Sequence, residues 1–155
     1  MPKIGRRASC VISLVLSVIT LAAIAVGAVF MPRIVAAMVE LKTDLAGAPF
    51  YLRYPFLLTI AYLILAVAAM CDAVLLSLLL AIRRGDVFSA ANVARIRAVS
   101  WGCIAASALF AALAPKYYIS AAVAFIAFFV GLCIRIVKNA FEEAVALKEE
   151  NDFTV

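Results

Sequence analysis

Four long apolar stretches dominate the pattern of hydrophobic and polar positions along the chain. We predict that each forms a helix, over residues 8–30, 56–82, 98–114 and 119–137. Helices of this length and apolar composition can cross the ~30 Å hydrocarbon layer of a lipid bilayer. The pattern therefore predicts an all-α integral membrane protein, built as a single domain from a four-helix transmembrane bundle.

The polar connections between the apolar stretches predict where helices begin and end. Residues 31–55 form the longest connection, and part of it is predicted to be a short amphipathic helix on the external membrane surface. Its apolar residues at helical spacing are Ile34, Ala37, Met38 and Leu41. In the shorter connection 83–97, Gly85 can take the left-handed conformation that ends a helix. Ser89 is a suitable N-cap, so we expect the next helix to begin near Ala90.

The fourth apolar stretch leads without a break into a polar tail, residues 138–155. We expect the helix to continue into this tail, with Phe141, Val145 and Leu147 facing inward. At the other end of the chain, basic residues precede the first stretch, as they would precede the apolar region of a signal peptide. This stretch is longer than the roughly 7–15 residues usual there, so we expect it to remain as a helix.

The distribution of Lys and Arg predicts how the helices are oriented. Ten of the 14 basic residues lie before the first stretch, in the connection 83–97, or at the end of the last stretch and in the tail. The other two connections hold four. Because cytoplasmic segments are enriched in Lys and Arg, both termini are predicted to be cytoplasmic. The tail would then be a cytoplasmic helical extension of the last span.

Composition agrees with a membrane location and argues against several functions. Hydrophobic residues make up 68% of the chain and charged residues 15%, whereas a soluble domain is about half apolar and a quarter charged. The net charge of +5 comes from residues beside the apolar stretches, so we expect no direct nucleic-acid binding. The chain has no His, its four Cys lack paired spacing, and no nucleophile with a base is visible. We therefore expect no metal, no cofactor and no enzymatic activity.

Asp72 is the acidic residue that lies within an apolar stretch. It precedes Ile82 by ten residues, which places it about 15 Å from the cytoplasmic edge and near the middle of the membrane. A charge at that depth costs a few kcal/mol, so Asp72 is a candidate functional residue. One interpretation is a carboxylic acid hydrogen-bonded to a hydroxyl of a neighbouring helix; the candidate donors are Ser13, Ser17, Thr20 and Ser107. The other is proton or ion handling.

Small residues four positions apart form stripes in three of the predicted helices. Such stripes let helix backbones approach closely in a bilayer. The pairs are Ala23 with Gly27, Gly102 with Ala106, and Ala127 with Gly131. We expect them to pack helices within the chain, and formation of a homo-oligomer through one stripe is the alternative.

Two motifs at the predicted cytoplasmic face carry a resemblance. The first is Arg-Arg-Gly-Asp-Val-Phe-Ser at 83–89, followed by Asn92 and by Arg-Ile-Arg at 95–97. The second is Glu-Glu-Asn-Asp-Phe-Thr-Val at 149–155. Together they resemble the bacterial membrane-protein family labelled "domain of unknown function 2975", which includes YoaS-like proteins. The resemblance covers most of the chain from the second span onward, while the first span and the external connection match only in length and character.

The resemblance implies a four-span protein of the bacterial inner membrane for which no activity is established. It also implies a partner, because members are often encoded beside a small helix-turn-helix regulator. We therefore expect a non-enzymatic sensor or regulatory partner of such a cytoplasmic protein. The candidate docking residues are Arg83, Arg84, Phe88, Asn92, Arg95, Arg97, Asn151, Asp152 and Phe153. The alternatives are a small transporter or ion-coupled protein that uses Asp72, and an assembly subunit of a larger membrane complex.

Overall fold

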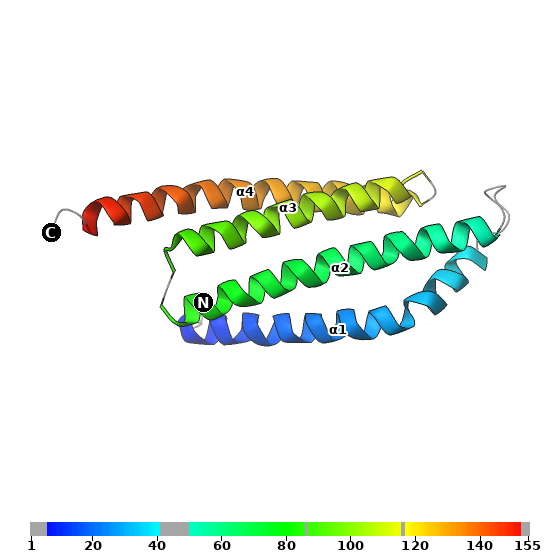
Figure 1. The fold of residues 1–155 in the computed structure, drawn as a ribbon, viewed down its shortest axis with the longest axis horizontal. Helices are drawn as coiled ribbons and strands as arrows, with labels where there is room; N and C mark the ends of the chain where they lie inside the picture. Colours follow the sequence, from blue (N-terminus) through cyan, green and yellow to red (C-terminus); the bar gives the residue numbers. More distant parts are fainter. Residues whose placement is uncertain (1–5, 41–49, 86, 116, 153–155) are drawn as a thin grey trace, which may run out of the picture.

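The computed structural model describes residues 6–40, 50–85, 87–115 and 117–152. They form four α-helices: α1 (Arg6–Glu40), α2 (Phe50–Arg83), α3 (Ala90–Leu113) and α4 (Tyr118–Asp152) (Figure 1). All four are long and apolar enough to span a membrane, which confirms the predicted all-α, multi-pass fold. The longest helices, α1 and α4, have 35 residues each. At 1.5 Å per residue they are about 52 Å long and must tilt or extend beyond a ~30 Å hydrocarbon layer.

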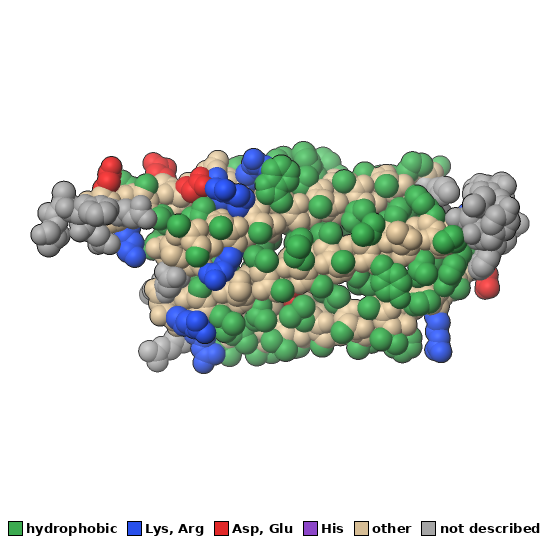
Figure 2. Space-filling view, viewed as in Figure 1, with side chains coloured by type: hydrophobic (Ala, Val, Ile, Leu, Met, Phe, Trp, Pro, Cys, Tyr) green, Lys and Arg blue, Asp and Glu red, His purple; other side chains and the backbone are tan. Residues whose placement is uncertain are grey.

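The helices lie side by side in chain order, as a row (Figure 1). Contacts join α1 to α2, α2 to α3 and α3 to α4, and within the described residues α1 does not reach α4. The predicted bundle is therefore open. Side chains such as Ile119, which is 82% exposed, and Phe125, which is 70% exposed, point outward. Apolar side chains cover most of the visible face between the two ends (Figure 2), a surface suited to lipid.

The α1 helix bends near Pro32, and its last turns lean toward α2 (Figure 1). Proline has no backbone N–H, so the carbonyl of Ala28, four residues earlier, loses its helical partner. The hydroxyl of Tyr62 in α2 donates to this carbonyl at 3.1 Å, so the neighbouring helix replaces the hydrogen bond that the proline removes. Beyond it, Val35 and Val39 are buried.

The prediction of a separate amphipathic helix on the membrane surface is therefore wrong, because residues 31–40 continue α1. Its residues Ile34 and Met38 are about half exposed, whereas the neighbouring Val35 and Val39 face the protein. The prediction assumed that the polar residues after position 30 mark a helix end. A bent helix that continues past the membrane boundary gives the same pattern. Leu41 lies outside the described residues.

The turn between α2 and α3 follows the predicted chemistry except at its cap. Gly85 has a φ of 90°, in the left-handed region where glycine is favoured. Ser89 is the N-cap of α3 with extended backbone, and the helix begins at Ala90 as predicted. However, the Ser89 hydroxyl makes no capping hydrogen bond; its backbone carbonyl instead accepts from the N–H groups of Asn92 and Val93.

The α3 and α4 helices pack along a seam with a seven-residue repeat. The hydroxyls of Ser100 and Ser107 donate to the carbonyls of Gly131 and Ala124, at 2.9 Å and 2.8 Å. A Cβ on Gly131 would lie 3.2 Å from Cys103 and from Ile104, so glycine permits this close approach. The two serines of α3 are seven residues apart, and so are the two acceptor residues of α4. A seven-residue repeat is typical of helices that pack with a left-handed twist.

The predicted stripes of small residues differ in what they contact. Gly102 and Gly131 are buried at helix interfaces, which confirms close packing at two of the three stripes. A Cβ on Gly102 would overlap with the Sγ of Cys71 in α2. A Cβ on Gly27 would meet nothing within 4 Å, so the stripe of Gly27 makes no such contact within the described chain.

Candidate functional site

Asp72 is buried between α1 and α2, with 9% of its surface exposed. The hydroxyl of Ser17 in α1, which is 4% exposed, donates to the Asp72 Oδ1 at 2.9 Å. Ser17 is one of the four predicted donors. Two of the others, Thr20 and Ser107, donate instead to backbone carbonyls. The interpretation of Asp72 as an acid hydrogen-bonded to a neighbouring helix therefore agrees with the geometry.

The second carboxyl oxygen of Asp72 differs from the first in its surroundings. Its Oδ2 atom is buried and accepts no hydrogen bond from the described residues. A buried polar atom without a partner costs about 1–3 kcal/mol, so this position is expensive to maintain. An unpartnered carboxyl oxygen can accept a proton or a cation, which is the chemistry that an ion-handling site would need. In the described part of the chain, no three His, Cys, Asp or Glu side chains come together as metal ligands would.

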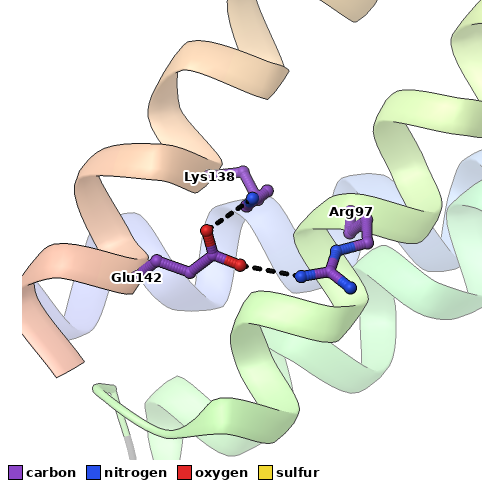
Figure 3. A network of polar contacts seen from close by, with 3 residues as sticks. All are labelled: Arg97, Lys138 and Glu142. Carbon is purple, nitrogen blue, oxygen red and sulfur yellow. Dashed lines mark hydrogen bonds and ion pairs between the residues drawn. The ribbon is translucent and has the colours of Figure 1, made fainter. Parts of the chain in front are cut away.

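A second polar region lies at the end of the molecule where α1 begins and α4 ends, which we call the charged end (Figures 1 and 2). Here α3 and α4 are joined by one carboxylate (Figure 3). Glu142 of α4 accepts from Arg97 of α3 at 2.7 Å and pairs with Lys138 of its own helix at 2.5 Å. The hydrogen bond from Lys138, together with that from Arg97, lowers the pKa of Glu142, which lies beyond the predicted span.

Aromatic and apolar contacts support the same junction. The rings of Phe88 and Phe141 lie 5.7 Å apart, and Val145 is buried. The predicted inward orientation of Phe141 and Val145 is confirmed. That of Leu147 is wrong, because its side chain is 61% exposed. Leu147 lies six residues after Phe141, a spacing that carries it away from the inward face of the helix.

The structure separates the predicted docking residues into exposed and structural groups. Arg83 and Arg84 are exposed at the end of α2, and Phe88 remains 44% exposed. Asn92 is fully buried, so its predicted role in docking is wrong and its role is structural. Its amide donates to the Val87 carbonyl at 3.1 Å and closes the turn before α3.

The remaining docking candidates either form hydrogen bonds or ion pairs within the protein, or have side chains that the structure does not describe. Arg95 donates to the Oδ1 of Asn92 at 2.6 Å, and Arg97 pairs with Glu142. The side chains of Asn151 and Asp152, and all of Phe153, lie outside the described residues. Lys138 and Glu142 were not among the predicted docking residues. Their spacing of four residues, which favours ion pairs on a helix, was the available signal.

An apolar cavity of about 520 Å³ lies at the opposite end of the molecule. All four helices or their flanking residues contribute to its wall: Met31, Ile34, Val35, Met38, Leu57, Ala61, Phe110, Leu113, Tyr117, Tyr118, Ile119 and Ser120. The α1 residues come from the part of the helix at and beyond the bend at Pro32. Its size is that of a small-molecule site. Its described wall is mainly apolar, and Tyr117, Tyr118 and Ser120 are the lining residues that carry hydroxyl groups. Sequence reasoning did not predict it.

One of three comparisons with known proteins found a match. No significant match was found among curated proteins or among solved structures. A family model described as "Protein of unknown function (DUF2975)" matches residues 48–155, which include α2, α3 and α4. The match covers more than two thirds of the chain and confirms the resemblance carried by the motifs at 83–97 and 149–155. This multi-pass membrane protein therefore belongs to the DUF2975 family of unknown function.

Proposed function

We propose that this protein is a non-enzymatic regulatory membrane protein that holds a small helix-turn-helix regulator against its charged end, on the cytoplasmic side of the membrane. The observation that carries the proposal is the extension of α4 beyond the length needed to span. About 20 helical residues cross a bilayer, and α4 has 35. The extension is ordered against α3 by Glu142 and the Phe88–Phe141 contact.

The surface of this extension supports a docking role. Leu147 is 61% exposed and Phe88 is 44% exposed, in a region that we place outside the hydrocarbon layer. Apolar side chains exposed to water are candidate contacts for a protein partner. Arg83 and Arg84 add exposed positive charge at the same end of the molecule. The charged end therefore exposes both apolar and basic side chains, and a protein partner can contact side chains of either kind.

The proposal is tested by measuring binding between the full-length membrane protein in nanodiscs and the purified small helix-turn-helix protein encoded beside it. Leu147→Glu should weaken binding about tenfold or more, because it replaces an exposed apolar side chain of the extension by a charge. The matched control is Ile136→Ala, which changes an exposed residue of the same helix within the predicted span. The control should bind like the wild type. Absence of binding by the wild type, or equal binding by Leu147→Glu, contradicts the proposal.

A second candidate function is ion- or proton-coupled transport through Asp72. It is favoured by the Asp72 Oδ2 atom, which has no hydrogen-bond partner among the described residues. This function requires water to reach Asp72 from at least one side of the membrane. Asp72→Asn should then abolish a proton- or ion-dependent flux in liposomes. Thr20→Val, which changes an exposed hydroxyl of α1, is the control and should retain the flux. No flux from the wild type, or unchanged flux from Asp72→Asn, rules out this candidate.

A further inference from the structure

Three basic side chains from α3 and α4 converge on a small cavity near the charged end. The cavity has a volume of about 40 Å³ and is lined by Arg97, Ser100, Trp101, Arg135 and Lys138. Lys138 is largely buried, with 15% of its side chain exposed, whereas Arg97 is 56% exposed. The cavity is therefore a pocket with a cationic floor and an open rim.

The position of the pocket along α4 places it at one boundary of the hydrocarbon layer. Tyr118 begins α4, and Arg135 and Lys138 follow it by 17 and 20 residues. At 1.5 Å per residue these distances are about 26 Å and 30 Å, which match the hydrocarbon thickness. Trp101 is 53% exposed beside the pocket, and indole rings are enriched at this depth. The pocket thus faces the headgroup region of the bilayer.

The charges in the pocket favour an anion. Glu142 neutralises part of the charge of Arg97 and Lys138, as Figure 3 shows. The guanidinium of Arg135 lies over the Trp101 ring at 5.1 Å, and no carboxylate pairs with it in the part of the chain that is described. Three cations and one carboxylate leave a net charge of about +2. Guanidinium groups bind phosphate through two parallel hydrogen bonds, so Arg135 and Arg97 suit a phosphate group.

We propose that this pocket binds the phosphate of an anionic phospholipid headgroup in the leaflet at the charged end. Basic pockets between transmembrane helices at this depth suit such headgroups. The depth favours a lipid over a soluble anion, because the glycerol and acyl chains can lie against the exposed face of Trp101. The proposal is independent of the proposed regulatory function, since it needs neither a protein partner nor a particular orientation in the membrane.

The test uses the intrinsic fluorescence of Trp101, which is the only tryptophan of the chain. The full-length protein is titrated in mixed vesicles with phosphatidylglycerol or phosphatidylcholine that carries bromine near the glycerol end of one acyl chain. Brominated phosphatidylglycerol should quench Trp101 at a several-fold lower mole fraction. A basic residue that contacts an anionic headgroup contributes about fivefold to binding. Arg135→Gln/Lys138→Gln removes two such residues from the pocket and should therefore lower this preference by about fivefold or more.

The matched control is Arg83→Gln/Arg84→Gln, which removes two exposed charges at the same end of the molecule but outside the pocket. It should retain the preference. If the pocket variant loses helicity by circular dichroism, the single variant Arg135→Gln carries the test, because this side chain is exposed. Three results overturn the proposal: equal quenching by the two lipids, an equal loss in the control, or displacement of the lipid by inorganic phosphate at matched ionic strength. The last would indicate a site for free phosphate.

Discussion

The close packing of α2 on α3 at Gly102 leads to a quantitative prediction. Replacing Gly102 by Ala adds a Cβ that would overlap with the Cys71 Sγ, while the Cys71 Cβ would be an ordinary 3.9 Å away. Overpacking of this kind costs about 1–3 kcal/mol. The better helix propensity of Ala offsets about 1 kcal/mol of that cost. We therefore expect Gly102→Ala to destabilise the protein by about 0–2 kcal/mol.

A double-mutant cycle isolates the contact. Cys71→Ala removes the Sγ and leaves only the Cβ, so Gly102→Ala should become neutral or stabilising in that background. The expected coupling between the two substitutions is about 1–3 kcal/mol, which is the cost of the overlap. Gly27→Ala is the control, because a Cβ there meets nothing within 4 Å. It should be neutral or stabilising in either background.

The assay is reversible unfolding of the purified protein in detergent, followed by far-ultraviolet circular dichroism. The cycle needs the wild type, Gly102→Ala, Cys71→Ala and the double variant, with Gly27→Ala measured in parallel. If Gly102→Ala and Gly27→Ala have the same effect with Cys71 present, the close approach of α2 and α3 is refuted. A coupling near zero leads to the same conclusion.

Four further substitutions test other contacts. Tyr62→Phe removes the donor to the Ala28 carbonyl and should lower the unfolding free energy in detergent by about 0.5–1.5 kcal/mol. An unchanged unfolding free energy would mean that this hydrogen bond does not stabilise the bend. Ser17→Ala leaves Asp72 without its hydroxyl donor and should cost about 1–3 kcal/mol, more than Asp72→Asn, which keeps an acceptor for Ser17. Because the pKa of Glu142 is lowered, its ion pairs stabilise the charged end above pH 4.5, the usual value, and are lost as the pH falls through the lowered one. Hydrogen exchange in the α4 extension should therefore rise on acidification, and Glu142→Gln should remove this pH dependence.

Local sequence patterns were sufficient to predict the backbone of the turn between α2 and α3, but not the side-chain contacts within it. The left-handed Gly85 and the start of α3 at Ala90 follow from preferences of single residues, and both were predicted. The burial of Asn92 was not, because its amide contacts the Val87 carbonyl and Arg95 in a way that only the folded turn defines. A residue of a recognised motif was therefore assigned to the surface although it is structural.

The amino-acid sequence by itself determined that this protein has four membrane-spanning helices and a long helical extension of the last one. It could do so because lipid offers no hydrogen-bonding partners, so each span must satisfy its own backbone as a helix and carry enough apolar side chains. The tertiary structure decided which hydroxyl reaches Asp72, that the helices form an open row, and that Arg97 meets Arg135 and Lys138 at one pocket. These features join residues far apart in the chain. Their arrangement depends on how helices of similar apolar character pack against one another, and this is not encoded in the hydropathy of any one segment.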